Sequence, residues 1–263
     1  MKSSVTFQTG SGLIVPAVTA DQMREVDRIA VEDYGLSILQ MMENAGRNLA
    51  LNVIDMLGSQ VVWREPALSE SEGPGQRAEA AILAGSGGNG GGGLCCARHL
   101  HNRGSGVSVV LSKDAADLRG PAAKQLRILR RAGLEPIGLS RAEEVLRRAQ
   151  LVVDALVGYS LRGAPRGRVA DLIDLCNEHA PRVVSLDLPS GLDATTGETP
   201  GVVVRPERTL TLALPKTGLR GLPGELHLTD IGIPPEVYAA VGVAFEWPFP
   251  ERDWVRLKVG RSR

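Results

Sequence analysis

The segment Gly85–Leu94 is the feature that most constrains what this chain can fold into. Its sequence is GSGGNGGGGL, so seven of its ten residues are glycine. It follows the apolar run 80–84 and leads into a helical pattern that continues to Leu100. A strand, a glycine loop and a helix in this order allow backbone N–H groups at the helix start to hold an anion, because the missing Cβ atoms permit close approach. The segment therefore predicts an anion-binding loop within an α/β protein.

The same glycines also fit the dinucleotide-binding pattern G-x-G-x-x-G, at positions 85, 87 and 90. By itself this match is weak evidence in a chain that contains 31 glycines, and a flexible connector is the alternative. A dinucleotide-binding fold would also need an acidic residue after the next strand, about 20 residues further on. Asp114 is the candidate, but it comes late and follows Lys113. A nicotinamide-dependent dehydrogenase would need this acid and a hydride-transfer site, and the sequence supplies neither convincingly.

The remainder of the chain alternates between short apolar runs and helical patterns. Strands are expected at 80–84, 107–111, 151–155, 182–187, 208–213 and 225–229, and helices at 20–30, 38–57, 93–103, 120–132, 141–148 and 167–179. This alternation predicts a three-layer, Rossmann-like α/β fold, with a mostly parallel central sheet and helices on both of its faces.

We expect one domain over residues 1–263, with its core at about 20–235. Residues 1–18 are expected to form an irregular arm, and residues 236–263 a C-terminal extension. The stretch 64–79 is rich in proline, glycine, serine and glutamate, which predicts a mobile loop.

The overall composition excludes several classes of function. The chain has 30 basic and 30 acidic residues, which argues against a general electrostatic grip on nucleic acid or on an anionic membrane. No apolar stretch reaches the length of a membrane span, and the N-terminus lacks the apolar centre of a signal peptide. We therefore expect a cytoplasmic protein without a membrane or nucleic-acid partner.

The cysteines and histidines show no spacing typical of a metal site. Cys95, Cys96 and Cys176 form no C-x-x-C pair, so we interpret them as reduced, buried side chains. The four histidines are interpreted as surface or helix-end residues: His99, His101, His179 and His227.

Polar side chains stand at the ends of four predicted strands. They are Asn89, Asp154, Asp187, Ser190 and Lys216. In parallel sheets, ligands bind beyond the carboxyl ends of the strands, so these side chains should meet in one crevice. Each one could instead cap a loop or lie in solvent. Their oxygen ligands suit a hard cation, and two carboxylates could divide the work, one binding the cation and the other exchanging a proton.

Several blocks of the sequence resemble the NAD(P)H-hydrate epimerase family, also called the YjeF N-terminal domain. They are MMENAGR at 41–47, the glycine loop followed by ARHL at 97–100, VDALVG at 153–158 with GAPRG at 163–167, DLPSGLDATTG at 187–197, and LALPK at 212–216 with DIGIP at 230–234. Their order and spacing match the family from about residue 20 to residue 235.

The resemblance implies an isomerase that interconverts the R and S hydrates of NADH and NADPH as metabolite repair. It implies a homodimer, a bound potassium ion, and a separate hydrate dehydratase acting on the same pathway. The implied potassium ligands are Asn89, Asp154 and Ser190. The implied substrate contacts are Gly88, Asn89, Gly90, Gly91, Gly92, Gly158, Tyr159, Ser160, Leu161, Arg162, Gly163, Ala164 and Asp187. We predict that Asp187 is the catalytic acid and base, with Lys216 as its electrostatic or proton-handling neighbour.

The glycine loop departs from the family pattern at two positions. The family usually has G-x-G-N-N-G-G-D-G, whereas Gly88 replaces the first asparagine and Gly92 replaces the aspartate in this chain. The lost carboxylate leaves a second hypothesis open, namely a non-catalytic relative of the same fold that associates with a nucleotide or RNA.

Overall fold

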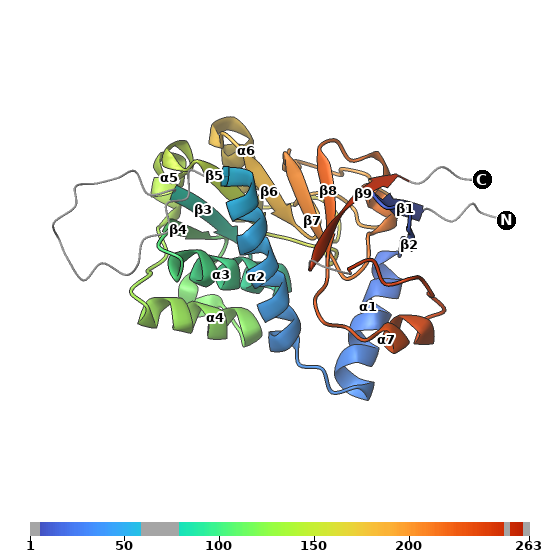
Figure 1. Ribbon diagram of the computed structural model, residues 1–263. Helices are drawn as coiled ribbons and strands as arrows, with labels where there is room; N and C mark the ends of the chain where they lie inside the picture. Colours follow the sequence, from blue (N-terminus) through green and yellow to red (C-terminus); the bar gives the residue numbers. More distant parts are fainter. Residues whose placement is uncertain (1–5, 59–78, 250–252, 260–263) are drawn as a thin grey trace.

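The computed structural model describes residues 6–58, 79–249 and 253–259 (Figure 1). The strands are β1 Thr6–Thr9, β2 Ile14–Pro16, β3 Glu79–Ala84, β4 Gly106–Leu111, β5 Leu151–Ala155, β6 Val183–Leu186, β7 Arg208–Leu212, β8 Glu225–Thr229 and β9 Trp254–Val259. The α-helices are α1 Ala20–Arg28, α2 Ile38–Leu57, α3 Gly88–His101, α4 Gly120–Arg131, α5 Ala142–Arg148, α6 Arg168–His179 and α7 Pro235–Ala240.

Within the described residues, all nine strands belong to one sheet, in the order β2-β1-β9-β8-β7-β6-β5-β3-β4. The strands from β3 to β8 pair in parallel, whereas β1, β2 and β9 pair antiparallel at one end of the sheet. The predicted α/β class with a mostly parallel sheet is therefore confirmed.

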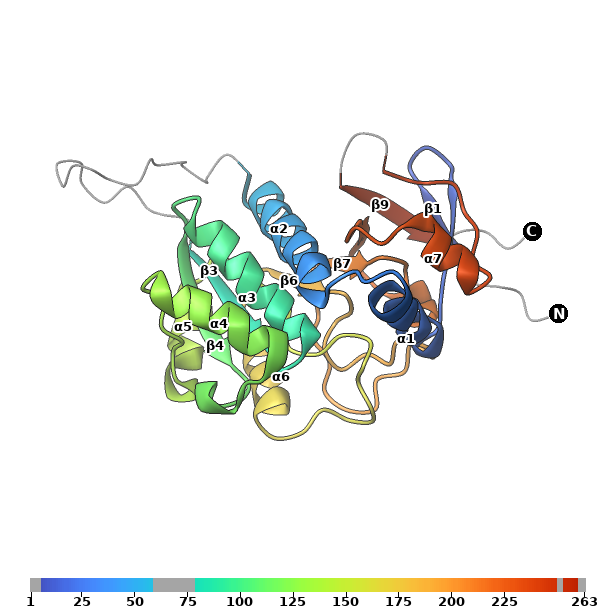
Figure 2. The same ribbon diagram turned by 90° about the horizontal axis from the view of Figure 1, so that it is seen from below.

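Helices cover both faces of the parallel part of the sheet (Figures 1 and 2). Alternate residues of β3 explain why, since both sets are apolar. Ile82 packs in a core that includes residues of α2, α3 and α4. Leu83 packs on the other face, in a core that includes residues of α5 and α6. A strand that is apolar on both sides must be covered on both sides, which gives the predicted three layers.

The strand order places a ligand crevice between β3 and β5. From β3 the chain passes through α3 to the edge strand β4, and then returns past β3 to form β5. Parallel sheets of this kind bind ligands at such a reversal, outside the carboxyl ends of the strands. The glycine loop follows β3 at this point, and the segment 156–160 follows β5.

The sheet extends beyond the segment 20–235 at both ends. The expectation of an irregular arm at residues 1–18 was wrong, because β1 and β2 form a hairpin there. β1 also pairs with β9, which lies in the C-terminal extension. Strands as short as β1 and β2 contain too few alternating apolar and polar residues to be recognised from the sequence. The pairing of β1 with β9 cannot be predicted from residue spacing, because the two strands lie at opposite ends of the chain.

Two other predictions concern the loop at 64–79 and the absence of a membrane span. Of the loop predicted at 64–79, only Glu79 lies within the described residues, where it begins β3. Among the helices that the structure describes, none is long and apolar enough to cross a membrane.

Candidate functional site

The glycine run serves both helix packing and access to the cavity beside it. Helix α3 begins at Gly88 rather than at the predicted residue 93, so the glycines at 90–93 form helical turns. A Cβ atom on Gly90 would lie 1.8 Å from the carbonyl oxygen of Gly85, so no larger residue fits there. Gly87 and Gly88, in contrast, have nothing within 4 Å of an added Cβ. The backbone at the start of α3 is therefore open to a ligand.

A cavity of about 510 Å³ lies beside this helix start. Its walls come from α1, α2, the glycine loop, the segment 158–160 and the ends of β6 and β7. Asn89, Asp187 and Lys216 all line it. The strand-end argument from the sequence thus correctly predicted that these three side chains face one space. Asp154 and Ser190, which were expected in the same crevice, are completely buried and do not line it.

Asp187 and Lys216 form a buried ion pair on the wall of this cavity. Asp187 is 3 % exposed and Lys216 is 1 % exposed. The Lys216 ammonium donates to Asp187 Oδ1 at 2.5 Å and to the Leu212 carbonyl oxygen at 2.9 Å. The backbone N–H of Tyr159 donates to the other carboxylate oxygen, Oδ2, at 2.9 Å. Both oxygens of Asp187 are therefore held in place, and its charge is balanced by one cation.

The backbone places this carboxylate through an unusual turn. Asp187 follows β6 directly and has φ of 68°, and Ala213 follows β7 directly and has φ of 62°. In each case the next residue donates its N–H to the last residue of the strand, at 2.9 Å for Leu188 and 2.7 Å for Leu214. A positive φ with this hydrogen bond defines a γ-turn of the rare, strained kind. The neighbouring parallel strands β6 and β7 therefore each end in a turn of this type, and the turn after β6 carries Asp187.

The backbone at Gly158 lies close to both Asp187 and Asn89. A Cβ atom at this position would lie 2.7 Å from Asp187 Oδ2 and 3.3 Å from Asn89 Oδ1. Only glycine allows the segment after β5 to approach both side chains.

Asp154 is completely buried and connects β5 to the Ser190 loop. It accepts hydrogen bonds from the Ser190 hydroxyl at 2.5 Å, the Ser190 N–H at 2.8 Å and the Ser185 hydroxyl at 2.8 Å. Burial raises the pKa of this carboxyl group, and the hydrogen bonds oppose that rise. The Ser190 hydroxyl also accepts from the N–H of Val157 at 2.9 Å. Asp154 therefore fixes the two loops that border the site.

The predicted potassium ligands offer only oxygen donors that suit such a cation. Asp154 and Ser190 are in direct contact and completely buried, whereas Asn89 lines the cavity. Within the described residues, the amide nitrogen of Asn89 is buried and has no hydrogen-bond partner. This amide N–H donor can bind an acceptor group of a ligand, whereas a cation would need the amide oxygen of Asn89.

The sequence did not indicate the contribution of helix α1. Asp27 lines the cavity and accepts a hydrogen bond from the hydroxyl of Tyr159. Burial raises the pKa of Asp27, while the bond from Tyr159 and the charge of Lys216 oppose this rise. The Tyr159 ring centroid lies 5.8 Å from Lys216 Nζ. The sequence contains one weak sign of this role, since Asp27 lies next to the buried Val26 on α1. An acid in that position is equally common on a solvent-exposed helix face, so the sign is ambiguous without the tertiary structure.

A second cavity, of about 420 Å³, adjoins the first. The two share Gly88, Asn89, Gly158 and Ser160 as lining residues. The second cavity extends over the carboxyl ends of β3 and β4. A ligand longer than either cavity could therefore run from one to the other across the start of α3.

The predicted substrate contacts fall into separate groups. Gly88, Asn89, Gly92, Gly158, Tyr159, Ser160 and Asp187 line the first cavity. Gly90 and Gly91 lie inside the first turns of α3, and the segment 161–164 lines neither cavity.

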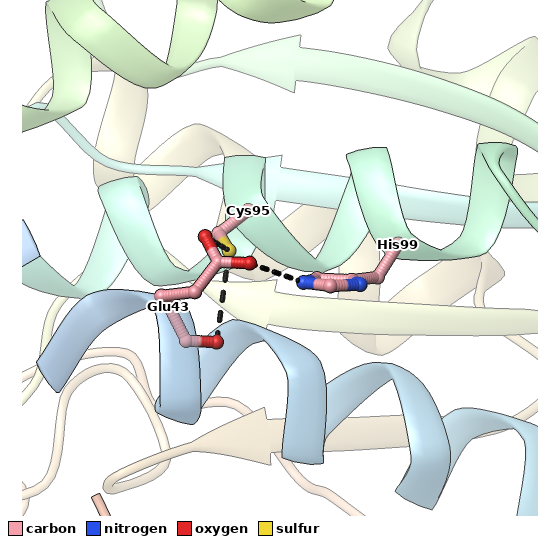
Figure 3. Close-up of side chains that lie close together, drawn as sticks. All are labelled: Glu43, Cys95 and His99. Carbon is pink, nitrogen blue, oxygen red and sulfur yellow. Dashed lines mark hydrogen bonds and ion pairs between the residues drawn. The ribbon is translucent and has the colours of Figure 1, made fainter. Parts of the chain in front are cut away.

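Glu43, which belongs to the MMENAGR block, joins α2 to α3 (Figure 3). Its carboxylate contacts the His99 ring at 2.8 Å and the Cys95 thiol at 3.4 Å. The ligand atoms of these three residues lie within 4.8 Å of one another. The guanidinium of Arg98 also donates to Glu43 at 2.5 Å, and burial raises the pKa of Cys95 to about 12. The Arg98 guanidinium already pairs with the Glu43 carboxylate, and burial disfavours the thiolate form of Cys95, so we interpret the cluster as a packing contact.

Fold and site together define a doubly wound α/β protein with a buried Asp–Lys pair in the crevice where the strand order reverses. Comparison with known sequences gives the family. Residues 38–218 match the family model described as YjeF-related protein N-terminus, and the chain belongs to this family. The resemblance found in the sequence is thereby confirmed.

Relatives of known name cover nearly the whole chain. A protein of Dehalogenimonas lykanthroporepellens named NAD(P)H-hydrate epimerase is 46% identical, over 97% of this chain and 98% of its own length. A Moorella thermoacetica protein named bifunctional NAD(P)H-hydrate repair enzyme Nnr is 39% identical, over 84% of this chain but 41% of its own length. The crystal structure of yeast ynu0 has the same fold, with a TM-score of 0.76 and 21% identity over 93% of this chain and 100% of that one.

Proposed function

We propose that this chain is an isomerase that interconverts the R and S hydrates of NADH and NADPH. The observation that carries this proposal is the buried Asp187–Lys216 pair, which faces a cavity next to an open helix start. The name of the Dehalogenimonas relative supports the same reaction. Retention of both charged residues favours catalysis over the alternative of a non-catalytic nucleotide- or RNA-associated relative.

In this proposal the hydrated nicotinamide ring occupies the first cavity, beside Asp187. The pyrophosphate lies over Gly87 and Gly88, where free N–H groups and the helix dipole of α3 favour negative charge. The unpartnered amide of Asn89 can donate a hydrogen bond to the same group. The remainder of the dinucleotide extends toward the second cavity.

The proposed chemistry is loss and return of water at one carbon. The hydrated carbon bears a hydroxyl group next to the ring nitrogen, whose lone pair can expel it. The hydroxyl takes up a proton and leaves as water, and an iminium-like ring remains. Water then adds to either face of that ring and gives up a proton to a carboxylate. We assign the proton transfer to Asp187 together with Lys216: the ammonium of Lys216 supplies the proton of the first step through this carboxylate, and Asp187 returns the proton of the second step to Lys216.

The proposal includes a potassium ion held by Asn89, Asp154 and Ser190. A bound potassium ion would supply positive charge beside the phosphate groups and the buried carboxylate. These residues already order the loops after β5 and β6 through the Asp154–Ser190 contact. We therefore expect the ion to influence substrate affinity more strongly than the fold.

We further propose that the chain works as a homodimer and alongside a hydrate dehydratase. The name of the Moorella relative, a bifunctional NAD(P)H-hydrate repair enzyme, supports a second activity that acts together with this one. The dimer is tested by the mass of the purified protein in solution.

The test uses purified R-hydrate of NADPH and follows appearance of the S-hydrate by chromatography. We expect a rate well above the spontaneous one, higher in potassium than in sodium chloride. Asp187→Asn should reduce it by at least a hundredfold. Asp171→Asn on α6 is the matched control, because this exposed aspartate lies outside both cavities. No rate above the spontaneous one would support the non-catalytic alternative, and full activity of Asp187→Asn would refute the assignment.

A further inference from the structure

The second cavity lies where a doubly wound fold places the adenosine ribose. β3 is the strand that leads into the glycine loop, and β4 is the next strand of the parallel set. In dinucleotide-binding folds, an acid after this second strand binds the 2′-hydroxyl of the ribose, whereas a nearby cation accommodates a 2′-phosphate. The residues that follow β4 are therefore informative about which dinucleotide fits.

The residues lining this cavity include three cations and no acid. Lys113 follows β4, and Arg166 and Arg168 come from the segment between β5 and α6 on the opposite side. Asp114, the acid that a 2′-hydroxyl would need, instead binds Arg168 at 2.5 Å. Lys113 and Arg166 form no ion pair with any residue that the structure describes. Two cations from separate elements are therefore available to an anion.

The two cavities lie on either side of shared walls, which fits one extended ligand. The second cavity, of about 420 Å³, shares Gly88 and Asn89 with the first as lining residues. A dinucleotide whose pyrophosphate lies at the start of α3 would place its nicotinamide on one side and its adenosine on the other. The cations would then lie on the adenosine side.

We propose that Lys113 and Arg166 bind the 2′-phosphate of the substrate, so that this chain prefers hydrated NADPH to hydrated NADH. The proposal rests on the proposed function, because it requires a dinucleotide in the first cavity. The 2′-phosphate is the only group that distinguishes the two substrates, and its negative charge is complementary to this wall of the second cavity.

The first experiment measures binding without any reaction. Calorimetry at low ionic strength compares 2′,5′-ADP, which carries the 2′-phosphate, with 5′-AMP, which lacks it. We expect about tenfold tighter binding of 2′,5′-ADP, and loss of this preference in the double variant Lys113→Ala/Arg166→Ala. The control Lys124→Ala/Arg127→Ala removes the same charge from the exposed face of α4 and should keep the preference. Salt at 0.5 M should weaken it.

The second experiment compares kcat/KM for the hydrates of NADPH and NADH. The ratio should exceed about 5 in the wild-type chain and fall toward 1 in the double variant, mainly through KM for the NADPH hydrate. Equal binding of 2′,5′-ADP and 5′-AMP, or a preference unchanged by the double variant, would overturn the inference while leaving the epimerase proposal intact. A binding preference that the variant abolishes supports the inference even where no epimerase activity is found, and only the proposed function then fails.

Discussion

The buried ion pair makes a quantitative prediction for Lys216→Met. This change leaves the Asp187 carboxylate buried at 3 % exposure without its cation, although the N–H of Tyr159 still donates to it. Removing one partner of a buried pair typically destabilises a protein by about 3–5 kcal/mol, because the other charge stays desolvated. We therefore expect Lys216→Met to lower the free energy of unfolding by that amount, which is a large fraction of the stability of an ordinary domain.

The double variant Lys216→Met/Asp187→Asn separates charge from packing. Asn retains an acceptor for the Tyr159 N–H but carries no charge, so it should recover about 2–3 kcal/mol relative to Lys216→Met alone. Urea unfolding followed by circular dichroism measures all four members of the cycle. Lys124→Met on exposed α4 is the control and should change the stability by less than about 0.5 kcal/mol. Single losses that simply add, with a coupling below about 0.5 kcal/mol, would show that the pair is not desolvated as described.

Three further predictions concern glycines in the site and one buried histidine. Gly158→Ala places a Cβ atom 2.7 Å from Asp187 Oδ2 and should reduce kcat at least tenfold, a result that steady-state kinetics can contradict directly. Gly92→Asp meets only the flexible end of Leu186, at 2.8 Å, and introduces the usual family carboxylate into the first cavity. We expect a severalfold lower KM, and an unchanged KM would show that the chain has no need of this group. Burial and nearby Arg208 lower the pKa of His227 to about 4. The unfolded chain therefore binds a proton below pH 6.5 that the folded chain does not, and stability should fall by about 2 kcal/mol between pH 7 and pH 5. His227→Gln should flatten this slope in urea unfolding, and an equally steep slope would exclude His227 as its cause.

The convergence of Asn89, Asp187 and Lys216 on one cavity could be predicted because parallel strands end at the same edge of the sheet. Asp187 and Lys216 follow neighbouring strands, and their pairing needs only that these strands end at the same edge of the sheet. The contact of Asp154 with Ser190 follows from the same reasoning across β5 and β6. The roles assigned to these residues as catalytic groups and potassium ligands stay predictions.

Features that depend on packing between distant segments could not be predicted. Asp27 and Tyr159 are 132 positions apart, and their contact depends on how α1 docks over the loop after β5. The helical glycines at 90 and 93 contradict helix propensity, because the lack of space for a Cβ atom outweighs it: the added atom would meet the Gly85 carbonyl oxygen or the Ala155 Cβ. The interpretation of His227 as a surface residue was wrong: it is 7 % exposed, since β8 is covered by β9 at its side rather than lying at an open edge.

The paired γ-turns have a consequence for transplanting this site into another scaffold. The carboxylate of Asp187 owes its position to a left-handed backbone residue at the end of β6, and the neighbouring Ala213 turn begins the loop that brings in Lys216. Copying the two side chains onto ordinary strand ends would direct them elsewhere. A transplanted site would therefore need both strands together with their turns. Only the turn at Ala213 could be altered, because Ala213→Gly keeps the geometry and removes a steric penalty of about 1 kcal/mol.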